Sequence, residues 1–288
     1  MKRILITGAT GNVGLEVIKS LHELDHSFEV VAGIRDFVKE KDKLAEYAVS
    51  LIKFDFTDFS THQAALTNCD TLFLLRPPQI SDVNTYFKPL IDTAKATGVK
   101  HIIFLSVQGV ENSKFIPHHK IEKLIVDSQI PYTFLRPAYF MQNFSTTLRD
   151  DLVNKNRIFL PAGHAKFTLI DVRDIGRVAA QVLTNPADYL NKAFDLTCRE
   201  KLTFEEMAEK LSKGLGKMVQ YQSPNPLKFY LIKRKEQVPS GFILVMIMLH
   251  YFPRFQKEPL ITDWVKKITS QQPKTFEQFI QDHKTLLT

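Results

Sequence analysis

The apolar positions in the first half of the chain fall into short runs rich in β-branched residues, and segments of helical length separate these runs. Six runs are predicted as strands: Ile4 to Thr7, Glu29 to Ile34, Ser50 to Phe54, Thr71 to Leu75, His101 to Ser106 and Tyr132 to Arg136. Strands that alternate with helices form βαβ units, in which the strands run parallel and helices cover both faces. We therefore expect an α/β fold built on a doubly wound parallel sheet of the Rossmann type.

The alternation becomes irregular after Arg136, where prolines and glycines interrupt the chain. A strand is predicted at Phe167 to Ile170 and a helix at Ile175 to Leu183. Thr203, three residues before Glu206, has the spacing of a capping box and predicts the start of another helix. The pattern indicates a Rossmann domain over residues 1–150 and a smaller α+β lobe over residues 151–288, with some later segments returning to the first domain.

The segment from Gly241 to Phe252 is apolar nearly all round and lies between Pro239 and Pro253. It is too short to cross a membrane, so we expect it to be buried. One interpretation is a core helix of the smaller lobe, and the other is a wall of an apolar substrate pocket or a subunit contact. Met246 and Met248 suit a pocket that adapts to its ligand.

Composition places the chain among globular proteins outside the membrane, because 44% of its residues are hydrophobic, 24% are charged, and no run reaches about 18 apolar residues. The first strand begins at Ile4 and leaves no room for a signal peptide, so a cytoplasmic location is expected. Cys69 and Cys198 lie far apart without a metal-binding pattern and are expected to be buried thiols.

The net charge of +7 is carried by the second half of the chain. Its densest basic run is Lys233-Arg234-Lys235, which is typical of a solvated helix face and does not predict nucleic-acid binding.

The most specific motif follows the first strand and contains Gly8, Gly11 and Gly14. Gly8 permits a sharp turn, Gly11 lets the backbone approach a phosphate, and Gly14 permits close packing of the following helix, predicted at Val13 to Leu24. Unpaired amides at the start of that helix then meet the anion. The loop predicts a dinucleotide site, and the residues assigned to it are Gly8, Thr10, Gly11, Asn12, Val13 and Gly14.

The end of the second strand bears on the choice of dinucleotide. Arg35 follows the strand and offers a planar guanidinium suited to a 2′-phosphate, whereas Asp36 could instead accept from the ribose hydroxyls of NAD. The order of the two residues favours NADP(H) over NAD(H).

Several motifs resemble the NmrA-like branch of the atypical short-chain dehydrogenases/reductases, a family that contains quinone, azo-dye and triphenylmethane reductases. The resemblance covers the whole chain and rests on Ile6-Thr7-Gly8-Ala9-Thr10-Gly11-Asn12-Val13-Gly14, Leu75-Arg76-Pro77-Pro78, Phe104-Leu105-Ser106, Leu135 to Asn143, Ile170 to Ile175 and Pro273 to Phe279.

The resemblance implies a Rossmann domain with a small C-terminal lobe and NADP(H) between them. Position by position, it implies that Asp55 and Phe56 flank the adenine and that Leu75, Arg76 and Pro77 border the nicotinamide-side ribose. It further implies that Ser106, Val107, Pro137 and Tyr139 follow the strands that close around the nicotinamide half. For each residue, ordinary loop or core packing is the competing interpretation.

The chain lacks the Tyr-x-x-x-Lys pair with which short-chain dehydrogenases transfer a proton. The corresponding region contains His118 and Glu122, whose spacing resembles the His-x-x-x-Glu of the quinone and dye reductases. His118 could orient the nicotinamide or the substrate, supported by Glu122, and Lys120 could bind a ribose hydroxyl or stabilise an oxyanion. A solvated helix start is the alternative for this region.

These observations predict an NAD(P)H-dependent reductase that transfers hydride directly to a quinone or a similar conjugated, aromatic small molecule, without flavin or metal. Tyr139 and Asn143 are the candidate substrate-lining residues. The alternative is a redox-sensing regulatory protein that binds NADP(H) without turnover and relays its state to a protein partner. A carbonyl-modifying enzyme is disfavoured because the tyrosine is missing. No nucleic acid or membrane partner is expected, and a homodimer is possible.

Overall fold

The computed structural model describes residues 2–288 and divides into two compact units. The first unit contains the described residues up to Pro137 together with Val172–Leu196 and Trp264–Gln272. The second contains Ala138–Asp171, Thr197–Asp263 and Pro273–Thr288. No helix among residues 2–288 is both long enough and apolar enough to cross a membrane.

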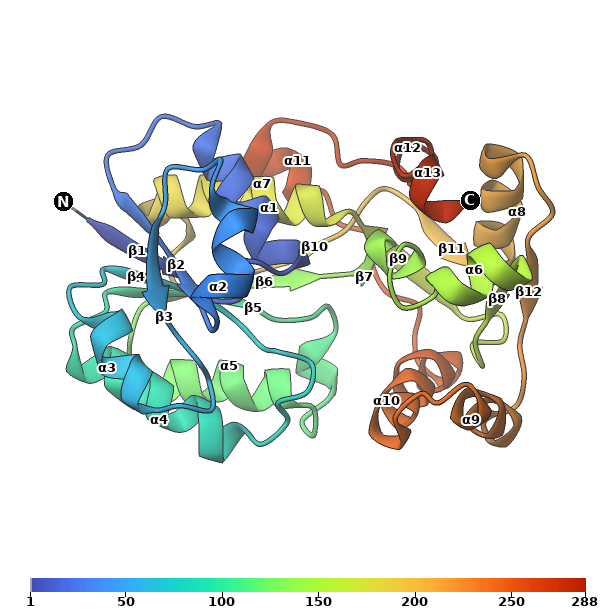
Figure 1. Cartoon of the computed structure of the whole chain (residues 1–288), viewed down its shortest axis with the longest axis horizontal. Coiled ribbons are helices and arrows are strands. Elements are labelled where there is room, and N and C mark those ends of the chain that lie inside the picture. Colours follow the sequence, from blue (N-terminus) through green and yellow to red (C-terminus); the bar gives the residue numbers. More distant parts are fainter. Residues whose placement is uncertain (1) are drawn as a thin grey trace. The chain divides into compact units, whose positions relative to one another are not determined.

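The first unit is built on a seven-stranded sheet in which every strand runs parallel to its neighbours (Figure 1). The strands, in spatial order, are β10 (Lys192–Leu196), β6 (Tyr132–Pro137), β5 (His101–Leu105), β4 (Thr71–Leu75), β1 (Arg3–Ile6), β2 (Glu29–Ile34) and β3 (Ser50–Lys53). The predicted α/β fold of the Rossmann type is confirmed, and all six predicted strands form with ends within one residue of the prediction. The order reverses between β1 and β4, the position at which doubly wound sheets bind their ligands.

Helices cover both faces of this sheet (Figure 1). One face carries α1 (Asn12–His22), α7 (Val172–Thr184) and α11 (Trp264–Thr269), and the other carries α3 (Ser60–Leu66), α4 (Val83–Ala96) and α5 (Pro117–Ser128). The short helix α2 (Phe37–Glu40) follows β2. Helix α7 packs against α1 through Gly176, where an added Cβ would lie 2.5 Å from the carbonyl oxygen of Glu16.

The second unit combines two small sheets with six helices. The larger sheet has the order β11 (Lys201–Thr203), β9 (Lys166–Ile170) and β7 (Tyr139–Phe140), and the smaller one pairs β12 (Gln220–Gln222) with β8 (Arg157–Phe159). The helices are α6 (Arg149–Lys155), α8 (Phe204–Leu215), α9 (Pro226–Lys235), α10 (Ser240–Tyr251), α12 (Phe276–Asp282) and α13 (Lys284–Leu287). Its core contains the fully buried rings of Phe144, Phe204, Phe229, Phe276 and Phe279.

Local sequence signals were sufficient to predict several details of both units. Thr203 and Glu206 form the predicted capping box at the start of α8, with the Glu206 amide donating to the Thr203 hydroxyl over 3.2 Å. Cys69 of the first unit and Cys198 of the second are buried free thiols, as predicted, and burial raises the pKa of the Cys69 thiol to about 11.

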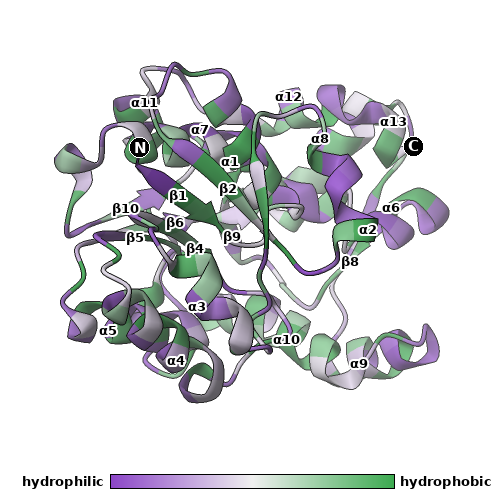
Figure 2. Cartoon of the chain, turned by 60° about the vertical axis from the view of Figure 1, so that its left-hand side comes forward, coloured by the Kyte–Doolittle hydropathy of each residue, from purple (hydrophilic) through white to green (hydrophobic). Residues whose placement is uncertain are grey.

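Helix α10 is far less buried than its composition predicts. Only Ile243, Met246 and His250 are buried, because α10 packs on α9 along one narrow face. The other side chains of α10 are partly or largely exposed. The hydropathy colouring shows that the helix is predominantly hydrophobic (Figure 2). Its exposed side chains are Phe242, Leu244, Val245, Met248 and Leu249. The interpretation of this segment as a core helix is therefore wrong.

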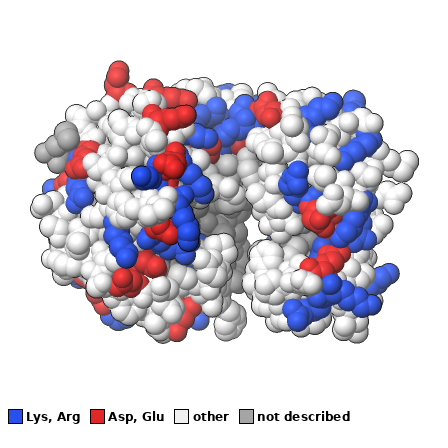
Figure 3. All heavy atoms as spheres, in the orientation of Figure 1, with Lys and Arg blue, Asp and Glu red and all other residues white. Residues whose placement is uncertain are grey.

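The basic run at the end of α9 also differs from the prediction. Lysine and arginine side chains gather over α9 in Figure 3, and Arg234 and Lys235 are exposed. Lys233, however, is buried, so the run is not a uniformly solvated face. Lys233 is buried in unit 2 because its ammonium is paired within a network of charged side chains.

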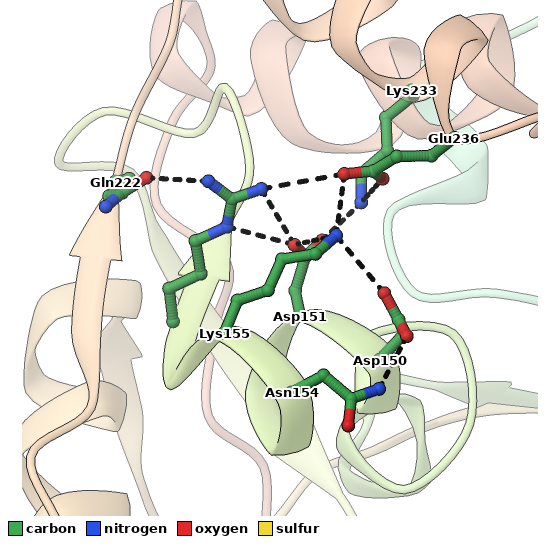
Figure 4. A network of polar contacts seen from close by, with 8 residues as sticks. Asp150, Asp151, Asn154, Lys155, Gln222, Lys233 and Glu236 are labelled. Atoms are coloured by element: carbon green, nitrogen blue, oxygen red, sulfur yellow. Dashed lines mark hydrogen bonds and ion pairs between the residues drawn. The ribbon is translucent and has the colours of Figure 1, made fainter.

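That network joins α9 to α6 and β8 (Figure 4). Lys233 contacts Asp151 and donates to Glu236 over 2.8 Å. Arg157 donates to Asp151 over 2.9 Å, and Lys155 donates to Glu236 over 2.7 Å. Every buried charge thus meets an opposite charge, which is the condition under which burial of ionised groups is tolerated.

We predict that Asp151→Asn destabilises the protein at neutral pH by about 3 kcal/mol, because it leaves the buried Lys233 ammonium with one carboxylate fewer. Urea unfolding measures this change. The matched control is Asp127→Asn, which removes an exposed pair with Lys123 and should cost less than about 0.5 kcal/mol. Equal costs for the two variants would contradict a structural role for the network.

The pH dependence of this destabilisation follows from the sign of the pKa shift. Burial alone would raise the pKa of Asp151, but the hydrogen bond and charge of Lys233, together with Arg157, hold it below its usual range. A carboxyl whose pKa is lowered by folding stabilises the protein above its unfolded pKa of about 3.9 and loses that contribution as pH falls through the folded value. The difference between wild type and Asp151→Asn should accordingly shrink below about pH 4.

Candidate functional site

The loop between β1 and α1 is held in one conformation by close backbone contacts. Gly8 has φ +60°, a left-handed conformation that residues with a side chain rarely adopt. The Gly11 amide donates to the Gly8 carbonyl over 3.0 Å. A Cβ at Gly14 would lie 2.2 Å from that same carbonyl oxygen, which is closer than two atoms can approach. Glycine is therefore required at position 14 for α1 to begin against the loop.

The start of α1 is electropositive and has no anionic group of its own. Gly11 at the N-cap provides no side-chain acceptor, and the first turn contains no acidic residue. The amides of Asn12 and Val13 have no acceptor within the helix, and the helix dipole adds partial positive charge there. A negatively charged group such as a pyrophosphate fits this position.

The end of β4 forms the neighbouring wall at the point where the strand order reverses. Leu75 packs on Gly8 so closely that a Cβ there would meet its Cδ atoms at 2.8 Å. The Thr7 hydroxyl donates to the Phe73 carbonyl over 3.0 Å and accepts from the Leu75 amide over 3.1 Å. These bonds fasten the end of β1 to the end of β4, so the glycine loop and the predicted residues Leu75 to Pro77 lie side by side.

Arg76 brings together two of the predicted site residues. Its guanidinium donates from Nε to His118 Nε2 over 3.4 Å, and from NH1 to the carbonyl of Ile80 over 2.7 Å. NH1 also donates to the carbonyls of Pro77 and Pro78, each over 3.1 Å. Arg76 has no carboxylate partner among residues 2–288, and its burial lowers the pKa of the guanidinium.

His118, near the start of α5, is neutral in this environment. Burial, assisted by the nearby positive charge of Arg76, lowers its pKa to about 3. Because Nε2 accepts from Arg76, the proton of the neutral ring resides on Nδ1. His118 is thus a hydrogen-bond donor through Nδ1 and is not a reservoir of acid at neutral pH.

Glu122 does not support His118 as predicted. Its carboxylate accepts two hydrogen bonds from Arg136, over 3.0 Å from Nε and 2.7 Å from NH2. The bidentate geometry of a guanidinium and a carboxylate is stronger than a contact with a neutral imidazole, which explains the difference. Lys120 is exposed on the same helix, and its ammonium makes no hydrogen bond with any described residue.

The ends of β5 and β6 contribute the next predicted residues. Ser106 is buried, and its hydroxyl has no hydrogen-bond partner among residues 2–288. An unpaired buried hydroxyl is costly and indicates a missing ligand or water. Val107 is half-buried, and Pro137 is buried with its carbonyl accepting from the Gln108 amide over 3.0 Å.

The residues predicted for the adenine end have different surroundings. Phe56 is a core residue, with its ring packed against Phe54 and Phe87, so only its backbone is available to a ligand. Asp55 lies at the end of β3, and its carboxylate accepts from the amide and hydroxyl of Thr57, each over 2.8 Å.

Arg35 and Asp36 follow the end of β2 and have different surroundings. Arg35 is exposed, and its guanidinium makes no ion pair or hydrogen bond with any described residue. Asp36 caps α2 by accepting from the amides of Val38 and Lys39 over 3.0 and 3.3 Å. The hydrogen bond from the Lys39 side chain is the main cause that lowers the pKa of Asp36.

Sequence reasoning missed Glu40, which joins this segment to the glycine loop. Its carboxylate accepts from the Thr10 hydroxyl over 3.3 Å and from the amides of Arg35 and Asp36 over 2.9 and 3.3 Å. No short motif marks this residue, because the contact depends on how β1 and β2 lie beside each other.

Tyr139 and Asn143 belong to the second unit, where Tyr139 contacts a histidine that the sequence did not single out. His250 Nδ1 donates to the Met246 carbonyl over 2.6 Å, so in the neutral imidazole Nε2 is the acceptor. The Tyr139 hydroxyl therefore donates to His250 Nε2 over 3.2 Å. Burial raises the pKa of Tyr139 well above its usual range, opposed by a hydrogen bond with Asn143. Burial also lowers the pKa of His250 to about 4, so both groups are neutral at pH 7. In the sequence, His250 is distinguished only as the histidine within the apolar segment from Gly241 to Phe252.

Comparisons with known proteins give the chain its family. Prestalk A differentiation protein A of Dictyostelium discoideum is 30% identical over 97% of this chain and 91% of its own length. NAD(P)H azoreductase of Xenophilus azovorans is 28% identical over 97% of both chains. Quinone oxidoreductase 2 of Escherichia coli is 28% identical over 83% of both.

Among solved structures, the triphenylmethane reductase of Citrobacter sp. in complex with NADP(H) superimposes with a TM-score of 0.85. It is 25% identical and covers 98% of this chain and 99% of its own. The model of the NmrA-like family matches residues 1–280. The predicted family is thereby confirmed, with NAD(P)H-dependent oxidoreductases among the relatives matched over nearly the whole chain: the protein belongs to the NmrA-like family.

Proposed function

We propose that the protein is an NADPH-dependent reductase of quinones and similar conjugated aromatic molecules that works by direct hydride transfer. The observation that carries this proposal is the glycine loop, in which Gly8 and Gly14 bring a bare helix N-terminus to the point where the strand order reverses. A ligand with a negatively charged, compact group would satisfy those amides.

Residues of the first unit are proposed to bind the pyrophosphate and the nicotinamide half of the cofactor. The Gly11 to Gly14 segment would hold the pyrophosphate, and Leu75 with Pro77 would border the nicotinamide-side ribose. The unpaired Ser106 hydroxyl would meet a polar group of the nicotinamide half, which supplies a hydride when bound. Arg76, a half-buried cation to which no carboxylate of residues 2–288 is paired, would compensate negative charge on the ligand.

The polar groups of the site favour hydride transfer without a strong general acid. His118 has a pKa of about 3 and would orient the ligand through Nδ1. Quinones and cationic dyes accept hydride at electron-poor positions, so the chain's main tasks are to position the two reactants and exclude competing reactions. The reduced product can take its proton from water.

The second unit offers a surface suited to flat aromatic molecules. Helix α10 exposes Phe242, Met248 and other apolar side chains, and Tyr139, which is only partly buried, adds a neutral hydroxyl group. Relatives named for azo dyes, quinones and triphenylmethane dyes support the same substrate class. We propose α10, Tyr139 and Asn143 as the substrate-binding elements.

NADPH is proposed as the preferred cofactor because Arg35, at the end of β2, presents a guanidinium that no group within the described part of the chain pairs with, while the Asp36 carboxylate is used as a helix cap. The relative in complex with NADP(H) supports this assignment.

A regulatory protein without turnover is the second candidate. It is favoured by the 30% identity to a relative that is named for a role in differentiation and not for a reaction. A sensor of this kind would bind NADP(H) through the same loop and relay its oxidation state to a protein partner. The two candidates differ in one property, because only an enzyme consumes NADPH when an acceptor is supplied.

We predict that the purified protein oxidises NADPH when a quinone, an azo dye or a triphenylmethane dye is added, measured anaerobically by absorbance at the reduced nicotinamide band. Tight NADPH binding without consumption across the panel would favour the regulatory candidate. Loss of both binding and consumption would contradict the proposed function altogether.

We predict that Gly11→Ala weakens NADPH binding at least tenfold, or about 1.4 kcal/mol, while the protein stays folded. The added methyl group would lie 3.3 Å from the Gly8 carbonyl, a tight but tolerable contact, and would occupy the path of the phosphate. Titration calorimetry measures the dissociation constant. The control is Gly216→Ala, which strains the C-cap of α8 in the second unit and should leave the dissociation constant unchanged.

We predict that His118 stays neutral between pH 5 and 8, so it adds no inflection to the pH profile of kcat/KM in that range. Its folded pKa of about 3 lies below this range, and protonation is therefore negligible there. An NMR titration of the imidazole measures the pKa directly. Arg76→Met should raise the pKa of His118, because it removes a nearby positive charge. A wild-type value near 6.5 would contradict the neutral assignment.

A further inference from the structure

Glu40 occupies a position that an anionic ligand would otherwise take. Its carboxylate accepts from two consecutive amides, those of Arg35 and Asp36, and from the Thr10 hydroxyl in the glycine loop. These donors come from two separate segments that lie side by side at the carboxyl ends of β1 and β2. The carboxylate therefore bridges the phosphate loop and the segment that reads the adenosine ribose in doubly wound folds.

The neighbouring groups show that this arrangement is more than a cap of α2. Asp36 already caps α2 through the amides of Val38 and Lys39. The Arg35 and Asp36 amides precede α2. Glu40 is the last residue of α2, and its carboxylate accepts hydrogen bonds from both of these amides. Lysine and arginine side chains surround this segment in Figure 3, with acidic side chains among them. Within this segment, Arg35 and Lys39 are exposed.

We propose that Glu40 sets the choice between NADPH and NADH by competing with the 2′-phosphate for the amides of Arg35 and Asp36. The inference rests on the proposed function, since it assumes that a dinucleotide binds the glycine loop. A 2′-phosphate must displace the carboxylate from these amides or bind beside a like charge. The 2′-hydroxyl of NADH, in contrast, can donate a hydrogen bond to the Glu40 carboxylate without displacing it. Glu40 consequently restrains the preference for NADPH that Arg35 provides, and the protein uses both cofactors.

Glu40→Gln tests the proposal because glutamine keeps the shape and one acceptor oxygen but removes the charge. We expect the dissociation constant for NADPH to fall about tenfold, while that for NADH stays constant or rises. The same ratio should shift for the fragments 2′,5′-ADP and 5′-AMP, which carry the ribose difference without the nicotinamide. Titration calorimetry at low ionic strength measures all four constants, and added salt should reduce the shift because it screens charge.

Two variants serve as controls for this measurement. Glu46→Gln removes an equal charge from an exposed residue nearby that makes no hydrogen bond to the loop, and it should leave the ratio unchanged. Arg35→Ala should weaken NADPH and 2′,5′-ADP binding and spare NADH and 5′-AMP. Thermal unfolding of each variant checks that the fold is intact.

The outcomes separate this inference from the proposed function. An unchanged ratio in a folded Glu40→Gln variant overturns the role of Glu40 and leaves the reductase proposal standing. A shifted ratio without NADPH consumption by any acceptor supports Glu40 and overturns the reductase. Failure of the wild type to bind either dinucleotide overturns both.

Discussion

The contact between the Gly8 carbonyl and the backbone of Gly14 is the constraint on which the first unit depends. A Cβ at position 14 would lie 2.2 Å from that oxygen, so α1 can start directly against the loop only because the side chain is absent. A second close backbone approach involves the same helix, α1. Gly176 lets α7 rest on α1 with a potential Cβ 2.5 Å from the Glu16 carbonyl. Strand β1, α1 and α7 are thus fixed in series, and the amides at the start of α1 are held ready for an anion.

The buried or half-buried cations of the two units have different kinds of partner. In the second unit, the buried cation Lys233 meets Asp151 and Glu236, and the network is satisfied internally. In the first, the half-buried Arg76 is held by carbonyl groups and by a neutral histidine. The former arrangement stabilises a fold, whereas the latter leaves positive charge available to a ligand. Glu40, an anion lodged among donors, fits the same interpretation, because its place is one that a phosphate could take.

The sequence predicted those features that depend on local patterns. Six strands, the glycine loop and the Thr203 capping box each follow from residues adjacent in the chain. Strand β10 was not predicted, because it is a five-residue edge strand in which only Phe194 and Leu196 are buried.

The errors concern contacts between distant segments. Glu122 was paired with His118 on helical spacing, whereas Arg136 from β6 offers it a stronger bidentate partner. The α10 segment was expected to be buried because it is apolar, yet its surroundings cover only one face. Glu40 and His250 were missed for the same reason, since their partners at Thr10 and Tyr139 lie 30 and 111 residues away in sequence.

The most direct test of the central claim, that a dinucleotide held by the glycine loop gives its hydride straight to a conjugated substrate, uses NADPH deuterated at C4 of the nicotinamide. A triphenylmethane dye is the suitable acceptor, because hydride adds to a carbon whose hydrogen does not exchange with water. Mass spectrometry of the colourless product formed in ordinary water should show one deuterium when the transferred face of C4 is labelled, and none when the opposite face is labelled. A product that carries only protium from both labelled faces would contradict direct transfer.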